Sequence, residues 1–320
     1  MRLLACVLLA WLVYQAGGAS AAGACAPDGW CVDTLVPGPA GHPRFTAIWS
    51  AGPDDVWAAG ARGDGDGEAL AFHWDGRAWT PAPLPAAAGL NDLWGAGPRD
   101  VWAVGAGGVA LHWTGAAWSS VPTGATSTLN RLSGSGGGDV WAIGRAGLYH
   151  WDGRAWTRDP RLVLSAREEF LGDIWAVSPG DVWVAQGFNA RGSVAHFDGA
   201  AWTIAHPSPD TAFGLFGIWS SGAATWAVGE GEQVLRRAAG HWTQRRPPGG
   251  SAQGLVNVMA AGADMYAAGQ TVIHATARGP IETMTGVPAG SFPGLWVTRT
   301  QIWVAGSSNA GGAVVLHRAR

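Results

Sequence analysis

The sequence repeats one unit of about 40 residues seven times, and this period limits the fold more than any other feature. Each copy has an aromatic residue in a phrase such as Asp-Val-Trp-Ala, and five copies have a second aromatic residue seven or eight positions earlier. The first set is Trp57, Trp102, Trp141, Trp183, Trp226, Tyr266 and Trp303. The earlier set is Trp49, Trp94, Trp175, Trp219 and Trp296, with Ser133 and Met259 as the exceptions. A chain of this kind folds as an array of one repeated unit.

The copy that begins at Leu90 shows what each unit contains. Its stretches LNDLWG, DVWAVG, VALHW and AWSSVP alternate apolar with polar or small residues, and glycine-rich segments separate them. Such stretches are typical of short strands joined by tight turns. Four strands in a period near 40 residues indicate a β-propeller blade. The sequence therefore predicts an all-β, seven-bladed propeller with four-stranded blades.

The composition agrees with this architecture, since the chain has 21 tryptophans, 50 glycines and only 13% charged residues. Blades of a propeller pack face to face around an axis, so the space between them widens outward and favours large, flat side chains. Glycine supplies the positive-φ positions of the turns. We expect the repeated tryptophans to be buried between blades.

The two ends of the chain complement each other. The seventh copy stops after its third strand, at Arg320, whereas the segment from Trp30 to Pro37 resembles a fourth strand. Pairing the two would remove the edges that an open sheet exposes. We therefore expect the N-terminal strand to join the C-terminal blade and close the ring.

Residues 1–24 have the pattern of a signal peptide. Arg2 is followed by the apolar run LLACVLLAWLVY and then by small residues. The run is shorter than a membrane-spanning helix requires. Cleavage is expected after Ala21 or Ala24, which leaves residues 25–320 as a single propeller in a periplasmic or extracellular protein, without a membrane span and as a monomer.

Cys25 and Cys31 remain after cleavage, because Cys6 leaves with the signal. An even pair in an exported chain predicts a disulfide between them. The alternative is lipidation of Cys25 after cleavage at Ala24, which would make the protein an outer-surface lipoprotein. Ala22 stands where such signals usually have leucine, and this favours the disulfide.

The hairpins between the third and fourth strands resemble those of BNR or Asp-box propellers. They read HWDGRAW at 73–79, HWDGRAW at 150–156 and HFDGAAW at 196–202, beside the family pattern Ser-x-Asp-x-Gly-x-Thr-Trp. Here the aspartate and glycine are adjacent, and histidine takes the place of the hydroxyl residue. The resemblance covers nearly the whole mature chain and includes the photosystem assembly-factor-like propellers and many secreted bacterial repeat proteins. It implies a propeller without one activity, since such families range from sialidases to assembly factors and adhesins.

Charge and residue content argue against two classes of function. The net charge is -3, and the twenty cations are all arginines scattered along the chain, so we expect no nucleic-acid partner. A sialidase-like enzyme would need a tyrosine nucleophile with an acidic partner. Tyr14 lies in the signal, Tyr149 in a third strand, and Tyr266 at the position of a core tryptophan. We therefore expect no enzyme, no catalytic residues and no cofactor.

Histidine recurs at one place in the third strand of six copies, as His73, His112, His150, His196, His274 and His317, with Arg236 in the other. Sevenfold copies at a third strand lie roughly 14 Å from one another. Zinc ligands lie about 2 Å from their shared metal, so a metal ring is excluded. We expect each histidine to hydrogen-bond a turn of its own or the adjacent blade. The aspartates before the second strands, such as Asp55 and Asp100, are expected to close those turns.

The loop ARGDGDGE stands apart, because Asp64, Asp66 and Glu68 are a candidate for part of a calcium site. The chain lacks the rest of a twelve-residue calcium loop there.

Comparison of the copies also indicates a binding surface. The second-to-third and blade-to-blade connections vary most and emerge on the same rim, and loops on a rigid scaffold commonly hold function. The candidate binding residues are Arg161, Arg167, Glu168, Glu169, Phe170, Phe188, Asn189 and Arg191. We expect an exported, non-enzymatic binding or scaffold propeller with a protein or glycan partner on this rim. The alternatives are a glycan-directed propeller hydrolase or lyase with carboxylates near the axis, and a structural surface lipoprotein.

Overall fold

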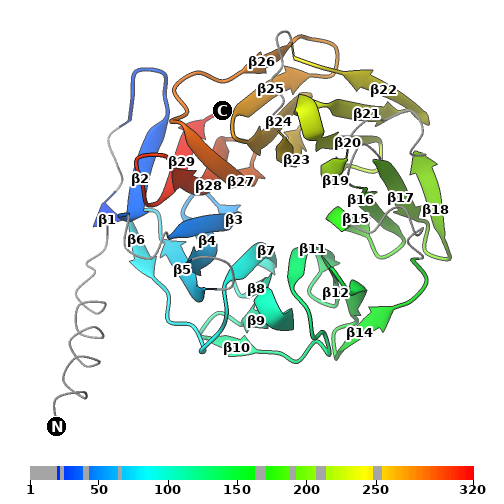
Figure 1. Cartoon of the computed structure of the whole chain (residues 1–320), viewed down its shortest axis with the longest axis horizontal. Coiled ribbons are helices and arrows are strands. Elements are labelled where there is room, and N and C mark those ends of the chain that lie inside the picture. The colour runs from blue at the N-terminus through cyan, green and yellow to red at the C-terminus, as the bar shows by residue number, and fades with distance from the viewer. Residues whose placement is uncertain are drawn as a thin grey trace.

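Seven antiparallel sheets stand around a central axis in the computed structural model (Figure 1). The structure describes residues 20–21, 25–38, 43–63, 67–162, 171–187, 192–206, 214–247 and 254–320. In each sheet the first strand of the blade lies next to the axis and the fourth lies at the rim. The predicted seven-bladed propeller with four-stranded blades is confirmed.

Blades 1 to 4 follow the repeat along the chain. Blade 1 consists of β3 (Arg44–Gly52), β4 (Asp55–Arg62), β5 (Glu68–Trp74) and β6 (Ala78–Pro81). Blade 2 consists of β7 (Leu90–Gly97), β8 (Asp100–Gly105), β9 (Ala110–Trp113) and β10 (Trp118–Ser120), with the short 3-10 turn η1 (Ala106–Gly108) after β8. Blade 3 consists of β11 (Leu129–Gly136), β12 (Asp139–Gly144), β13 (Gly147–Trp151) and β14 (Trp156–Asp159). Blade 4 consists of β15 (Leu171–Ser178), β16 (Asp181–Gln186), β17 (Ser193–Phe197) and β18 (Trp202–His206).

Blades 5 and 6 continue the pattern. Blade 5 consists of β19 (Leu215–Ser220), β20 (Ala224–Gly229), β21 (Val234–Ala238) and β22 (His241–Arg245), with the 3-10 turn η3 (Glu230–Glu232) after β20. Blade 6 consists of β23 (Leu255–Ala261), β24 (Asp264–Gly269), β25 (Val272–Thr276) and β26 (Ile281–Thr283). Within the described residues, no helix is long and apolar enough to cross a membrane.

Blade 7 is completed by a strand from the N-terminal part of the chain. It consists of β27 (Gly290–Val297), β28 (Gln301–Ser308) and β29 (Ala313–Ala319), and β2 (Cys31–Val36) is its fourth strand. β2 runs antiparallel to β29, with Cys31 opposite His317. The predicted closure of the ring is therefore confirmed. The two-residue strand β1 (Ser20–Ala21), from the predicted signal segment, pairs with the outer edge of β6.

Every inner strand has an irregularity at the same place. In β7 the register with β8 shifts between Leu90 and Asp92, and the other six inner strands have equivalent shifts. A β-bulge of this kind re-aims the side chains that follow it. The glycine that ends the Trp-Ala-Val-Gly phrase packs against this irregularity, since a β-carbon on Gly105 would overlap the carbonyl oxygen of Gly89.

The second-strand aromatics fill the wedge between blades, as predicted. Trp102 is fully buried, and its ring stacks on His112 of the same blade with centroids 4.0 Å apart. Its other neighbours come from blade 3, where Trp151 and Trp156 lie with ring centroids at 4.9 and 5.5 Å. One tryptophan therefore joins two blades by stacking and by edge-to-face contact.

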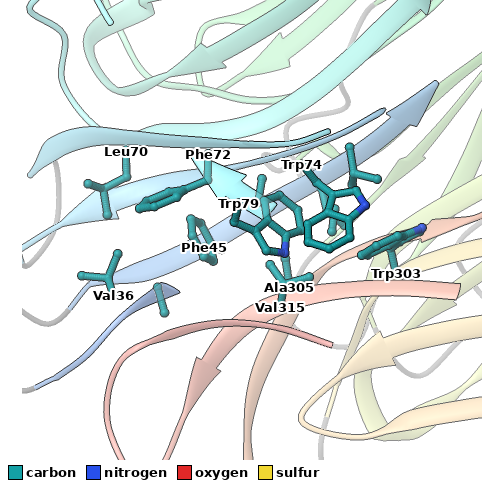
Figure 2. Packing of buried hydrophobic residues seen from close by; sticks show 13 residues of the cluster. Val36, Phe45, Leu70, Phe72, Trp74, Trp79, Trp303, Ala305 and Val315 are labelled. Atoms are coloured by element: carbon teal, nitrogen blue, oxygen red, sulfur yellow. The ribbon is translucent and has the colours of Figure 1, made fainter. Parts of the chain in front are cut away.

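The seam between blade 7 and blade 1 has the same kind of packing (Figure 2). Trp303 of β28 meets Trp79 of β6, beside Phe45 and Val315 in one buried cluster. The indole N–H of Trp79 also donates to Oδ2 of Asp33 in β2, at 3.1 Å. The closing strand is therefore bonded to blade 1 as well as to blade 7.

Candidate functional site

The connections divide the two ends of the ring into unlike faces. First-to-second connections span two or three residues, whereas blade-to-blade connections range from residues 284–289 to residues 160–170. Because the strands are antiparallel, the blade-to-blade connections leave at the same end as the second-to-third connections. We call this end the loop face and the opposite end the turn face. The variable connections therefore share one face, as the repeat comparison predicts.

Arg161 is the one predicted binding residue within the described part of the chain. It follows β14, and its guanidinium donates to both carboxylate oxygens of Asp159, with Nη2 at 2.6 Å from Oδ2. It also lies over the ring of Phe197 in blade 4, at 4.7 Å from the centroid. These hydrogen bonds raise the pKa of Arg161 and hold the pKa of Asp159 below its usual value, although burial alone would raise the latter. Arg161 thus joins blades 3 and 4.

The other predicted binding residues lie outside the described residues. They are Arg167, Glu168, Glu169, Phe170, Phe188, Asn189 and Arg191. Asp64 and Asp66 of the calcium candidate also lie outside them, and Glu68 is an exposed residue at the start of β5. In the described residues, no three His, Cys, Asp or Glu side chains come together as a metal site.

A groove on the loop face of blade 2 is a feature that the sequence comparison missed. It encloses about 380 Å³ between the blade-to-blade connections on either side of blade 2 and the η1 turn. Ala86, Val109, Val121 and Pro122 line it together with glycine and hydroxyl residues. The groove thus offers small apolar side chains and backbone groups, without a charged residue.

The axis of the ring holds a second group of residues. In each inner strand one position lies two residues before the aromatic, or before Ser133 and Met259 in the two blades that lack the aromatic. It is occupied, in blade order, by Ala47, Asp92, Arg131, Asp173, Gly217, Asn257 and Gly294. All but two of these line one axial cavity, and the three charged residues belong to consecutive blades. The sequence contains a signal for this group, which a comparison of the copies at this one position shows. Three copies have charged residues there, whereas the others have small residues or asparagine.

The two axial aspartates connect neighbouring blades. Oδ2 of Asp92 accepts a hydrogen bond from the backbone N–H of Leu132 in blade 3, at 2.8 Å. Oδ2 of Asp173 accepts one from Ile218 in blade 5, at 2.9 Å. Arg131 belongs to blade 3, which stands between the blades of the two aspartates, and its Nε lies 3.8 Å from Oδ1 of Asp173. One guanidinium therefore stands beside two carboxylates at the axis.

Burial dominates the titration of these carboxyls. It raises the pKa of Asp92 to about 6 and that of Asp173 to about 7, and the charge of Arg131 offsets only part of this effect. A raised carboxyl pKa is also a feature of general acids in enzymes. Such a role would require an axial cavity that is large enough to admit a substrate.

The axial cavity has a volume of about 30 Å³, which is room for only a few water molecules. Toward the turn face, Trp296 of blade 7 and Trp175 of blade 4 lie with ring centroids 6.4 Å apart. Trp49 and Trp219 continue this row of rings at 6.1 Å on either side. Side chains from opposite blades thus fill the axis, and the cavity is too small for a sugar ring.

The repeated histidines stay within their own blades. Nε2 of His112 lies 2.7 Å from Oδ1 of Asp100 at the end of the turn before β8, and the ring stacks on Trp102. The same pairing occurs in blades 1, 3, 4 and 6, with distances of 2.7 to 3.0 Å. The expected bond from each histidine to a turn is confirmed there, with the aspartate side chain as the partner. These aspartate carboxylates thus bond the histidine ring, whereas the sequence led us to expect that they close the turn.

The disulfide between Cys25 and Cys31 is present in the structure, as predicted. Cys31 is the first residue of the closing strand, and Cys25 forms an isolated bridge with it. The small loop thus holds the start of β2.

Comparisons with known proteins agree with the fold. No protein-family model matches the chain, and no curated protein matches it. Among solved structures, YCF48 bound to D1 peptide is similar, with a TM-score of 0.67 and 13% identity over 94% of this chain and 98% of the other. The extracellular domain of the putative hybrid two component system BT4673 from B. thetaiotaomicron gives a TM-score of 0.65 and 12% identity, over 89% and 39% of the two chains.

The WD40 repeats of RRP9 are similar to the same degree, with a TM-score of 0.68 and 11% identity over 93% of this chain and 100% of the other. The chain is therefore a seven-bladed propeller that is structurally similar to YCF48 and to the BT4673 extracellular domain. At identities this low the likeness concerns the fold, and a propeller fold hosts many functions.

Proposed function

We propose that this chain is an exported, non-enzymatic binding or scaffold propeller that engages a protein or glycan through its loop face. The observation that carries the proposal is the asymmetry of the ring. Connections of two to four residues cover the turn face, whereas the longest connections share the loop face. Loops of variable length on a rigid scaffold are the usual place for recognition.

Two further observations support this proposal. The groove of about 380 Å³ beside Val109 and Pro122 opens among these connections, and its small apolar lining suits a side chain of a partner. YCF48, a propeller of similar fold, has been solved with a D1 peptide bound. We also infer membership of the secreted BNR or Asp-box-like propellers from the repeated hairpins, because Asp75 accepts the turn amides of Arg77 and Ala78 in the first of them.

Export is part of the same proposal. The signal-like pattern of residues 1–24 predicts secretion, and the disulfide between Cys25 and Cys31 suits an oxidising compartment. We propose a soluble periplasmic or extracellular protein, with a surface lipoprotein attached through Cys25 as the alternative.

A hydrolase or lyase with axial carboxylates is the competing proposal, and Asp92 and Asp173 are its candidates. Backbone amides of the neighbouring blades already occupy both side chains. A general acid must reach the substrate within hydrogen-bond distance, and the axial cavity has room for only a few water molecules. These contacts favour a structural role for the two aspartates.

Capture from the native envelope or medium tests the proposal. The immobilised mature chain 25–320 is compared with a variant in which the blade-to-blade segments 82–89 and 121–128 are replaced by the shorter segment 284–289. We expect a protein or a glycan to be retained by the first chain and lost from the second, with both chains folded. Equal retention by both would overturn the assignment of the loop face.

A further inference from the structure

One cross-strand pair differs from its six equivalents. In every blade the second-strand aromatic lies opposite one third-strand residue, as Trp57 lies opposite His73. In blade 5 the pair is Trp226 and Arg236, in the same register. The guanidinium lies over the indole, 5.3 Å from the ring centroid, where the other blades stack an imidazole.

The partner of that side chain changes as well. The carboxylate that bonds the histidine stands two residues before the aromatic, and blade 5 has Ala224 at that position. Blade 7 also lacks it, because Gln301 stands there. His317 of blade 7 instead has Asp33 of the closing strand at 3.6 Å. Six of the seven repeated side chains thus have a carboxylate partner in the described structure.

Arg236 has no such partner among the described residues. Its Nε is buried and makes no hydrogen bond, and no described carboxylate lies within ion-pair distance of its guanidinium. In the next blade, Asp264 is already bonded to His274 and Arg320. A buried donor on a charged group without an acceptor is costly, and a carboxylate is the acceptor that satisfies it best.

The surroundings have the charge that attracts an acidic chain. Strands β21 and β22 have no aspartate or glutamate, and they contain Arg236, Arg237 and Arg245. Arg237 faces Trp183 of blade 4, and Arg245 donates to the carbonyl oxygens of Thr276 and Gly279 in blade 6, so their positive charge acts on the site from a distance. β22 is the last strand of its sheet, so its outer edge has no strand partner among the described residues. An unpaired edge offers backbone groups to an extended peptide.

We propose that blade 5 has a carboxylate-binding site on Arg236, near the turn face, which takes an aspartate or glutamate side chain of an acidic peptide segment. The incoming carboxylate accepts from Arg236 and occupies the place that Ala224 leaves vacant. This site is separate from the proposed binding surface on the loop face, because Ala224 begins its strand at the turn face, the opposite end of the ring.

The test follows the Arg236 Nε–Hε resonance of the ¹⁵N-labelled mature chain during titration with triglutamate blocked at both ends. Triglutamine with the same blocked ends is the uncharged probe. We expect a saturable shift with triglutamate and none with triglutamine. Backbone amide resonances of β21, which are present in both proteins, should report an affinity for triglutamate that is about tenfold weaker in Arg236→Gln. An Arg236 resonance that ignores triglutamate would overturn the proposal.

Ala224→Asp and Ala224→Asn form the matched pair. The aspartate would supply blade 5 with the carboxylate of the other blades, so we expect it to shift the Arg236 resonance by itself and to block triglutamate. The asparagine variant is nearly isosteric and uncharged, and it should bind as the wild type does. Equal behaviour of the two variants would contradict the proposal, and their unfolding curves show whether both are folded.

Arg237→Gln tests for unspecific charge, because Arg237 stacks over Trp183 in the other direction, at 5.2 Å. We expect its affinity for triglutamate to stay within about twofold of wild type. A loss as large as that of Arg236→Gln would mean diffuse attraction without a site. Free glucuronate is the last probe, and tighter binding of glucuronate than of triglutamate would replace the peptide by an acidic glycan.

Discussion

Trp303 in the last blade and Trp79 in the first blade meet edge to face, with ring centroids 6.1 Å apart. The contact joins the two ends of the chain, because β2 pairs with β29 beside it. The closing strand also accepts the indole N–H of Trp79 through Asp33. Ring closure thus depends on a single short strand and the side chains around it.

Deletion of residues 25–38 tests this closure. Without β2, blade 7 keeps an unpaired edge along β29 and the cluster of Figure 2 loses Val36. We expect the truncated chain to aggregate or to unfold without cooperativity, as seen by size-exclusion chromatography and urea unfolding. The chain 25–320 is the control and should remain intact. A monomeric truncation with a sharp transition would show that the ring closes without this strand.

Trp102→Ala measures the packing between blades. The substitution opens a cavity between blades 2 and 3 and should lower the free energy of unfolding by about 3–5 kcal/mol. Ile204, which is 51% exposed, provides the comparison, and Ile204→Ala should change the free energy by less than about 0.5 kcal/mol. Similar urea midpoints for Trp102→Ala and the wild type would be incompatible with a buried position.

The axial aspartates predict a pH dependence of stability. Their folded pKa values of about 6 and about 7 lie above the ordinary value of 3.8. Between pH 3.8 and these folded pKa values, the folded state therefore binds more protons than the unfolded state. The stabilisation is complete below pH 4 and is lost as the pH rises through 6 and 7. The unfolding free energy should therefore fall by about 2–4 kcal/mol from pH 5 to pH 8 through these two groups.

Asp173→Asn separates this effect from other groups. His317 contributes with the opposite sign, because burial lowers the pKa of its imidazole and folding then disfavours its charged form at low pH. The difference between wild type and Asp173→Asn removes that contribution. We expect the variant to lose most of the decrease between pH 5 and pH 8, and parallel profiles for the two proteins would refute the assignment.

The cysteines distinguish two localisations. A disulfide requires both thiols of Cys25 and Cys31, whereas lipidation uses the sulfur of Cys25 and leaves Cys31 free. We expect the intact mass of the exported protein to be two hydrogens below that of the reduced chain 25–320. A mass increased by a diacylglycerol group, with one titratable thiol, would place the protein at a membrane surface.

The period of the repeat predicts the architecture well because each blade buries the same positions. Trp57 and Trp102 occupy the same position of successive units, because each fills the space between its own blade and the next one. The missing fourth strand of blade 7 is visible as a gap in the repeat. The site is harder to predict, because its residues depend on differences between copies. Asp92, Arg131 and Asp173 come together only because a bulge turns the same position of three consecutive blades toward the axis.

Arg161 shows that the place of a residue in a long connection does not predict what its side chain contacts. Its position in a long connection suggests a free binding residue, but the turn after β14 brings its guanidinium back onto Asp159 and over Phe197. The local backbone conformation decides this outcome, and it has no periodic signal in the sequence. The groove beside Val109 has none either, because its lining consists of small residues from three separate connections.

Site-specific photocrosslinking tests the central claim, binding through the loop face, most directly. A photoreactive residue replaces Arg145, Gln270 or Asn309, which are exposed at second-to-third connections, or Pro53 or Ala263, which are exposed at first-to-second turns. The mature chains are exported in the native host, irradiated, and examined for covalent partners by mass spectrometry. We expect one partner to be captured from the loop-face positions and not from the turn-face positions. Capture of that partner at Pro53 and Ala263, with none from the loop face, would contradict the account.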